Sequence, residues 1–366
     1  MNRIIIVVSL LSVVLPARAG DMDLRLRGRL QTRFEVEERH QDGSLVSRVR
    51  LRRARVDGCW MPVKWIRLVL ELEGAARLDL QDANGAQSSQ AMLELKDAYG
   101  RFDLGREFLR VQVGQFKKPF SRLKMESPWD LLLPVRGLLN RYAVNHTQYS
   151  GYGGRDVGLM FSGRLKHLAR FSWKAGIFSG PRYVDRMENS STDYLARFQL
   201  RPFKGMRVAL NMSHKVYHYK EGATQPGVVL TRGATYTGNL FGADIRFRFN
   251  DLTLLVEGAL GDNLDFGPGH TLFGIHGTLA YSLEVYRNLW LIPAIMVEWF
   301  DPSDQDGYDS ALRVAVALNI DIEQIIRLVV FIEGASGEIV YWDPDAGGYV
   351  TEKPPIRTFV QLNMSF

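Results

Sequence analysis

Apolar and polar residues alternate along most of the chain, and the alternation is clearest between Leu24 and Val36. Mostly apolar residues occupy the even positions of this segment, whereas Arg25, Arg27 and Arg29 occupy odd positions. Because successive residues of a β-strand point to opposite faces, the pattern predicts a strand with one apolar and one arginine-rich face. About sixteen segments of roughly ten residues repeat it, and this is the length that a tilted strand of a membrane barrel needs.

The second segment repeats the alternation with one irregularity. Arg50 and Arg52 flank Leu51, but the next polar residue, Arg53, follows Arg52 directly, and Arg55 continues the new phase. One extra residue of this kind is what a β-bulge supplies. We therefore predict a bulge at Arg52 and Arg53, with arginines of both phases on the same face.

The connections between these segments alternate in length. Short connections are expected at 202–205, 250–251 and 284–288, and long ones at 117–154, 219–237 and 336–355. Tight periplasmic turns and long external loops are typical of an up-and-down membrane barrel. The sequence therefore predicts an all-β protein, a transmembrane antiparallel β-barrel of about sixteen strands.

Both ends of the chain carry targeting features. Residues 1–19 resemble a secretory signal peptide, with a short apolar run before a small-residue cleavage site, and an uncleaved anchor is the alternative. Residues 20–366 are then a single barrel domain. The alternating apolar ending resembles the signal by which outer-membrane barrels are recognised for assembly, and its residues are Val360, Leu362, Met364 and Phe366.

Arginines on the inward face of the first two strands are the candidate functional residues. The net charge of +6 is modest, so the placement of the charges matters more than their number. Guanidinium groups form charge-assisted hydrogen bonds with oxyanions, and several sites in a row let an ion bind without being trapped. We expect an anion path along Arg25, Arg27, Arg29, Arg33, Arg50, Arg52, Arg53 and Arg55.

Barrel interiors also contain arginines that only pair with carboxylates. This simpler interpretation is favoured for Arg110, Arg170 and Arg327. The outermost arginines of the first strands could instead meet lipopolysaccharide phosphates or lie at the periplasmic rim. Inward carboxylates would neutralise part of the arginine row, and the candidates are Glu71, Glu73, Asp156, Asp244 and Glu257.

The long segment 117–154 is too apolar for a freely solvated loop, because it contains Phe120, Trp129 and several leucines. We expect it to fold into the barrel as a constriction loop. The alternative is that it packs against a neighbouring subunit or covers the barrel mouth.

Several motifs resemble those of the phosphate-selective porin O/P family. They are Gly28-Arg29-Leu30-Gln31, Leu51-Arg52-Arg53-Ala54-Arg55-Val56, Asp97-Ala98-Tyr99, Val113-Gly114-Gln115-Phe116-Lys117 with Pro119-Phe120, and Arg155-Asp156-Val157-Gly158-Leu159. The resemblance implies a trimeric barrel with a narrowed, arginine-lined pore. It places Arg29, Arg52 and Arg53 on the pore wall, Asp97 near the constriction, and Lys124 in the inward-folding loop.

These features predict a passive porin for small anions, such as phosphate or polyphosphate, in the outer membrane of a Gram-negative bacterium. A non-selective diffusion porin is the first alternative, and a barrel enzyme or a plugged structural or adhesive barrel is the second. No G-x-S-x-G motif is present, and His214 and His218 lack a zinc-site context. We expect no metal, no cofactor and no nucleic acid. The expected partners are membrane lipid and lipopolysaccharide, the barrel-assembly machinery, and further copies in a homotrimer.

Overall fold

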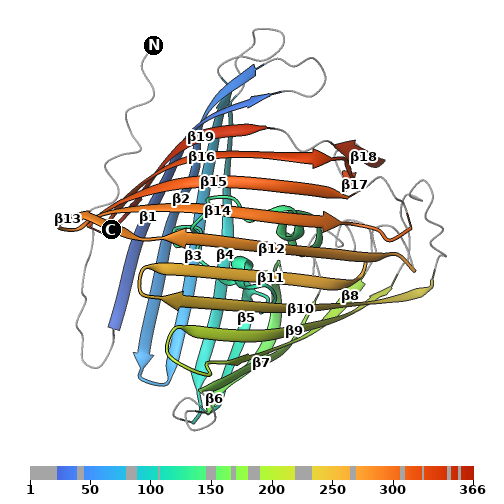
Figure 1. Ribbon diagram of the computed structural model, residues 1–366. Helices are drawn as coiled ribbons and strands as arrows, with labels where there is room; N and C mark the ends of the chain where they lie inside the picture. The colour runs from blue at the N-terminus through green and yellow to red at the C-terminus, as the bar shows by residue number, and fades with distance from the viewer. Residues whose placement is uncertain are drawn as a thin grey trace.

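The computed structural model describes residues 23–38, 45–79, 89–105, 108–145, 154–165, 170–179, 190–218, 233–263, 269–305, 310–323, 325–343, 348–352 and 356–366. The predicted signal peptide lies outside these residues and stays a prediction. The strands, drawn in Figure 1, are β1 (Asp23–Glu38), β2 (Leu45–Val63), β3 (Ile66–Asp79), β4 (Ser89–Asp103), β5 (Arg110–Lys117), β6 (Arg155–Leu165), β7 (Phe171–Phe178), β8 (Ser190–Leu200), β9 (Met206–His218), β10 (Thr235–Phe249), β11 (Leu252–Asp262), β12 (Thr271–Tyr281), β13 (Leu283–Tyr286), β14 (Leu289–Asp301), β15 (Ala311–Ile322), β16 (Ile326–Gly337), β17 (Ile339–Asp343), β18 (Gly348–Glu352) and β19 (Arg357–Ser365).

The described strands close into a 16-strand antiparallel barrel, as the alternation predicted. Most strands pair with their neighbours in the chain, β12 pairs with β14, β16 pairs with β19, and β1 pairs with β19 to close the ring. The short strand β13 pairs with β14 beyond the end of β12. β12 and β13 therefore occupy one strand position of the ring. A separate hairpin of β17 and β18 lies within the predicted long connection 336–355.

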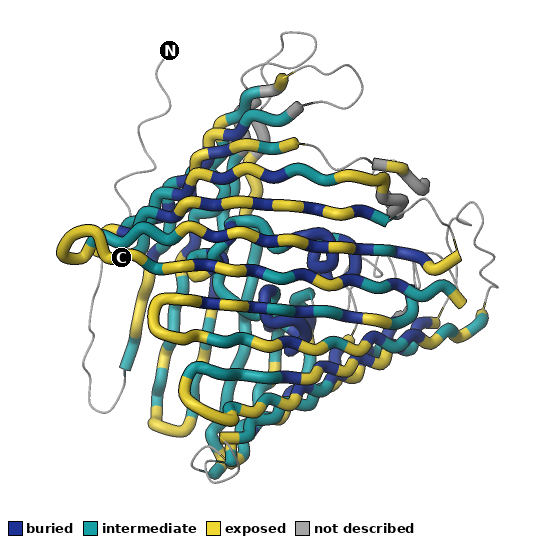
Figure 2. The backbone as a smooth tube through the Cα atoms, viewed as in Figure 1, coloured by how far each residue is buried: buried dark blue, intermediate teal, exposed yellow. Residues whose placement is uncertain are grey.

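Alternation along each strand separates an outer apolar surface from the interior. In β15, Leu312, Val314 and Val316 are exposed, whereas Arg313 and Ala315 between them are buried (Figure 2). Outward apolar side chains suit contact with lipid, and inward positions can then carry charge. The sequence pattern therefore predicted correctly which residues face outward and which face the interior.

The predicted bulge in the second strand is confirmed. Gln31 of β1 lies opposite Arg53, but the next residue, Thr32, lies opposite Leu51. Arg52 is thus the extra residue, and the pairing of β2 with β3 is interrupted over the same positions. The bulge lets Arg52 and Arg53 contribute to the same side of the wall.

Short turns lie at one rim of the barrel, which we call the short-turn rim. β8 and β9 are joined through 201–205, and β10 and β11 through 250–251, as predicted. β13 and β14 meet through 287–288, inside the predicted connection 284–288. Of the long connections, residues 219–232 and 146–153 lie outside the described part of the chain.

Residues 118–145, which we call the inward loop, lie within the ring of strands (Figures 1 and 2). They contain the short helix α1 (Arg122–Met125) and the π-helix η1 (Leu139–Asn145). None of the helices in the described residues is both long enough and apolar enough to cross a membrane.

Two buried apolar clusters hold the inward loop against the wall. Leu123, Leu131 and Leu133 pack with inward alanines of β12, β14 and β15, and with Phe331 and Phe359. Leu138, Leu139 and Tyr142 belong to a second cluster with aromatic residues of β5, β7 and β14. The apolar composition that predicted an inward fold therefore reflects packing on the inner surface of the same barrel.

Candidate functional site

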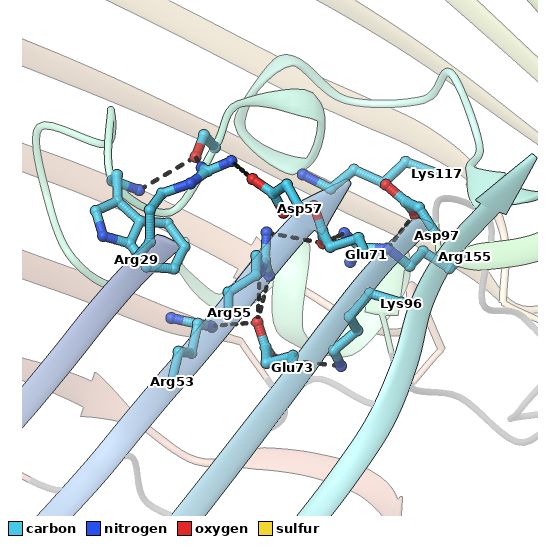
Figure 3. Close-up of polar contacts among 12 residues, drawn as sticks. Arg29, Arg53, Arg55, Asp57, Glu71, Glu73, Lys96, Asp97, Lys117 and Arg155 are labelled. Carbon is cyan, nitrogen blue, oxygen red and sulfur yellow. Dashed lines mark hydrogen bonds and ion pairs between the residues drawn. The ribbon is translucent and has the colours of Figure 1, made fainter. Parts of the chain in front are cut away.

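The arginines of β1 and β2 face carboxylates of the neighbouring strands (Figure 3). Arg29 pairs with Asp57, and Arg55 pairs with both Glu71, at 2.9 Å, and Glu73. Arg53 lies 3.5 Å from Glu73 and donates to Gln31 at 2.9 Å. Glu71 and Glu73 thus neutralise part of the arginine row, as the sequence suggested.

Asp97, expected near the constriction, pairs with an arginine from the far side of the inward loop. Its Oδ1 accepts from Arg155 Nε at 2.6 Å, and Arg155 Nη2 also lies 2.8 Å from Glu71 (Figure 3). Arg155 begins β6 and Asp97 lies in β4, so this ion pair bridges the shorter strand β5. The carboxyl group of Asp97 is therefore neutralised within the wall.

Two basic residues beside this network have no carboxylate partner. Arg52 and Lys124 are half-buried, and neither side chain forms a hydrogen bond or ion pair with the described residues. Arg136 and Lys117 donate to backbone oxygens of the inward loop instead, Arg136 at 2.7 Å to Leu123 and Lys117 at 3.2 Å to Glu126. The region where the inward loop meets β1–β5 therefore has an excess of positive charge.

Burial and this excess of positive charge lower the pKa of Lys124. Burial, followed by repulsion from Arg136, Arg155 and Lys117, lowers the pKa of Lys124 well below its usual value. An anion beside Lys124 would offset that repulsion and favour the charged amine. The arrangement is chemically suited to bind oxyanions, which accept charge-assisted hydrogen bonds.

The other predicted arginines have different surroundings. Arg33 is buried, stacks 3.6 Å from the centroid of the Phe359 ring, and donates to Gln361 at 2.7 Å. Arg50 lies 3.4 Å from Glu35. Arg25 and Arg27 are exposed at the short-turn rim, beside Asp23 and Asp57 respectively. The eight predicted arginines thus have different surroundings. Arg33 packs on Phe359, Arg50 lies beside Glu35, and Arg25 and Arg27 lie at the short-turn rim. The other four, Arg29, Arg52, Arg53 and Arg55, belong to the region described above.

The inward loop is tied to the opposite wall by carboxylates. Glu298 accepts from the backbone N–H groups of Leu138 at 2.8 Å and Leu139 at 2.9 Å, and it also pairs with Arg313 at 3.1 Å. Glu257 accepts from the backbone N–H of Leu123 at 3.1 Å. Glu257, predicted as a neutralising carboxylate, therefore has a different role, because it binds the loop backbone.

Asp244, another predicted carboxylate, does pair with arginines. It binds Arg122 of the inward loop at 2.6 Å and Arg197 of β8 at 2.7 Å. Asp156 lies 3.9 Å from Lys118. These pairs fix the first turn of the inward loop to the wall.

Trp129 was noted in the sequence only as an apolar loop residue. Its ring lies 4.8 Å from the Arg29 guanidinium carbon and 5.2 Å from that of Arg55. Such contacts are attractive through the ring quadrupole. An aromatic residue in a loop expected to meet an arginine wall was the signal that could have identified this contact.

The predicted assembly segment faces outward. Val360 and Phe366 are exposed, Leu362 and Met364 are half-buried, and Gln361 and Asn363 between them are buried. The backbone of Phe366 exchanges two hydrogen bonds with Gly28, at 2.8 and 3.1 Å. The last residue therefore takes part in closing the barrel, whereas its role in recognition stays a prediction.

Similar solved structures share this barrel at low sequence identity. The porin OmpF of Salmonella typhi, solved with daunomycin, has a TM-score of 0.64 at 12% identity, over 94% of this chain and 98% of that chain. An anion-selective porin from Comamonas acidovorans has a TM-score of 0.63 at 12% identity, over 94% and 100%. The trimer form of OmpT from Vibrio cholerae has a TM-score of 0.56 at 12% identity, over 95% and 100%. At this level of identity the likeness establishes the fold alone.

The family comparison goes further. No match is found among curated proteins. The family model described as "Phosphate-selective porin O and P" matches residues 25–239. This match extends beyond the motifs of residues 25–165 and covers more than half of the 366 residues. The chain therefore belongs to the phosphate-selective porin O and P family.

Proposed function

We propose that this porin is a passive channel for small anions in the outer membrane of a Gram-negative bacterium. The observation that carries the proposal is a pair of basic side chains, Arg52 and Lys124, that form no hydrogen bond or ion pair with the described residues where the inward loop meets the arginine wall. Arg52 is attracted by Glu73 and Glu35 only from a distance, and an anion beside Lys124 would favour the charged form of its amine. A narrow, low-dielectric passage focuses such a field and raises the local concentration of anions.

The ion-paired arginines have a second part in this proposal. Arg53 and Arg55 hold Glu73, and Arg155 holds Asp97, so carboxylates near the path are prevented from repelling an anion. An anion leaving water loses hydration, and guanidinium groups offset that cost with directed hydrogen bonds. Several modest sites in sequence favour passage over trapping.

Phosphate fits this chemistry because its oxygens accept several charge-assisted hydrogen bonds at once. The family to which the chain belongs supports phosphate as the first solute to test. A homotrimer is part of the same proposal, and the structurally similar OmpT was solved in a trimer form. The outward ending Val360 to Phe366 is proposed to contact the barrel-assembly machinery during insertion.

The decisive experiment compares reversal potentials of the reconstituted channel under a salt gradient. The variant combines Arg52→Gln with Lys124→Met, which removes both unpartnered charges. We expect a clear loss of anion preference and weaker block of chloride current by phosphate. A buried charge-assisted hydrogen bond is worth roughly 1.5–3 kcal/mol, so a dry site would lose at least about tenfold in phosphate affinity.

Two controls separate this effect from general damage. Leu51→Ala changes the outward residue next to Arg52 and should leave the reversal potential unaltered. Arg101→Gln removes a charge that pairs with Asp103 at 3.3 Å, away from the inward loop. If the double variant and the original protein have the same reversal potential, the channel is a general diffusion porin and the arginines only support the wall.

A further inference from the structure

Wall residues without a partner differ in how far they are buried. Arg110 and Arg327 have the carboxylate partners that the sequence favoured, at 3.0 and 2.6 Å. Arg170 was expected to have one too, but it forms no hydrogen bond or ion pair with the described residues. Because Arg170 is exposed, water can satisfy its guanidinium group. His276 of β12 is the opposite case, since it is only 1% exposed and neither ring nitrogen has a partner among the described residues.

A buried imidazole without partners is costly, because a polar group that leaves water without gaining a hydrogen bond loses free energy. The ring of His276 faces the interior, since His276 shares its face of β12 with the buried Leu272, while the adjacent Ile275 is exposed. Histidine is also the side chain that ordinarily changes its charge between about pH 5 and 8. The surroundings of His276 therefore determine what a charged ring would bind.

Carboxylates flank His276 on both sides. Its cross-strand partners are Glu257 of β11 and Glu298 of β14, and both are buried. Directly opposed residues of antiparallel strands have Cβ atoms about 5 Å apart, which lets side chains of this length meet. A protonated imidazole has two N–H donors, so it can serve one carboxylate on each side.

The same two carboxylates bind the backbone of the inward loop. Glu257 accepts from the N–H group of Leu123, and Glu298 accepts from those of Leu138 and Leu139. The loop also lies close to β12 itself, because a Cβ added at Gly274 would be 2.9 Å from Leu139 Cδ1. The cross-strand register thus places His276 between the two carboxylates that hold the loop.

Positive charge is missing on the β11 side of this arrangement. Glu298 has an arginine partner, whereas Glu257 forms no ion pair with the described residues. Asp244, which lies opposite Glu257 on β10, is already paired with two arginines, and Glu126 of the inward loop repels Glu257. A buried carboxylate without a counter-charge is destabilising. A protonated His276 would supply the missing charge.

We propose that His276 is a positioning residue for the inward loop, whose protonated ring binds Glu257 and Glu298 and holds the loop more firmly in mild acid than above neutral pH. Each carboxylate oxygen has two lone pairs, so the ring can donate without displacing the loop N–H groups. The stabilisation is present where the ring is charged and is lost as rising pH removes its proton. This inference concerns the hold on the loop and does not depend on which solute passes.

The test measures hydrogen exchange of loop amides in the full-length protein in detergent, at about pH 5.5 and about pH 8. Protection factors, which correct for the intrinsic exchange rate at each pH, are compared for peptides that contain Leu123 and for those that contain Leu138 and Leu139. We expect protection in the original protein to fall about tenfold at the higher pH, the effect of one charge-assisted hydrogen bond. In His276→Gln, protection should be equally low at both pH values, because the amide does not change its charge.

Two controls separate the charge of His276 from other effects. His214→Gln makes the same substitution at an exposed histidine that contacts Asn239 at 2.8 Å. Thr278→Val alters a buried residue on the same face of β12 without removing a titrating group. In both variants the fall in protection with pH should remain that of the original protein.

Glu257→Gln tests the same contact from the neighbouring strand, and it serves if His276→Gln does not assemble. It keeps an acceptor for the Leu123 N–H group but removes the charge that the ring would bind, so most of the pH dependence at Leu123 should be lost. Protection that is independent of pH in the original protein, or that falls equally in His276→Gln, would overturn the proposal. High protection of His276→Gln at both pH values would also contradict it. The reversal potential is not part of this measurement, so a negative result leaves the proposed selectivity open to its own test.

Discussion

The two sides of the barrel interior differ in what their inward positions carry. Strands β1–β4 present arginines and carboxylates, such as Arg53, Arg55 and Glu73, in an ion-paired layer (Figure 3). Strands β12, β14 and β15 instead present alanines, among them Ala294 and Ala315, on which the inward loop packs. One side carries the charges along which we propose that solutes pass, and the other side carries the surface on which the loop packs.

The difference explains how one chain obtains a narrow path inside a wide barrel. Small inward residues leave room for Leu123, Leu131 and Leu133 of the inward loop. Under the proposed function, the path for solutes then runs beside the basic residues of β1 and β2. The number of strands sets the width of the barrel, and the alanine side sets where the inward loop packs.

The largest expected effect comes from releasing the loop from the alanine side. Glu298→Ala removes the acceptor of two loop N–H groups and one partner of the buried Arg313. Losing a buried, hydrogen-bonded carboxylate costs on the order of 3 kcal/mol. We expect segment 117–154 to become accessible to added protease in intact cells, with larger single-channel conductance.

A neighbouring outward residue provides the comparison for this variant. Val297→Ala changes an exposed position one residue away and should leave the protease pattern unchanged. Gly137→Val attacks the same contact from the loop, since a Cβ there would lie 2.4 Å from Glu298 Oε2. Normal protection in both Glu298→Ala and Gly137→Val would mean that the Glu298 contact is not what holds the loop in place.

A smaller effect should follow from pH on the charged side. Burial and neighbouring cations lower the pKa of Lys124, so its amine loses the proton at a lower pH than a free lysine. The charged form exists below that pKa, and raising the pH through it removes positive charge from the path. Anion preference, measured as reversal potential, should therefore fall with rising pH before the usual range of lysine is reached.

Replacement of the titrating group sharpens this expectation. Lys124→Met should lower anion preference at pH values below the pKa of Lys124 and remove the contribution of this amine to the pH dependence. Lys124→Arg should keep anion preference constant, because a guanidinium stays protonated throughout. A pH dependence that survives in Lys124→Met would place the titrating group elsewhere.

The sequence predicted the wall far better than the contacts inside it. Period-two alternation is local, so the faces of β1 and β15 and the bulge at Arg52 could be read directly. The same rule placed Arg53 and Arg55 inward correctly. It could not tell which carboxylate each arginine meets, because Glu71 and Glu73 come from a strand whose register is set by pairing.

Contacts between the loop and the wall could not be predicted from the sequence for a related reason. The apolar content of 117–154 indicated burial, but not that Glu257 and Glu298 would bind its backbone from strands more than a hundred residues away. Inward alanines such as Ala315 and Ala317 were visible as small residues in an alternating strand. Their clustering opposite an apolar loop is the signal that would have indicated its docking side.

The smallest expected effect concerns Trp129, which links the two sides of the comparison. Its ring covers Arg29 and Arg55 of the charged side, while its backbone oxygen accepts from Arg327 of β16 at 3.0 Å. Trp129→Leu removes the cation–π contacts but keeps the backbone bond and both ion-paired guanidiniums. Each contact is worth about 0.5–1 kcal/mol, so thermal unfolding in detergent should shift by only a few degrees or so.

Selectivity should respond even less than stability in this variant. Arg29 stays paired with Asp57, and Arg55 with Glu71 and Glu73, so the charge beside the path is unchanged. The anion-to-cation permeability ratio should change by less than about twofold, while conductance rises because a large side chain has left the lumen. If Trp129→Leu instead exposed the loop to protease as fully as Glu298→Ala, the ring and not the alanine side would be the principal anchor. The loop would then be held mainly by the contact of Trp129 with Arg29 and Arg55, on the charged side of the interior.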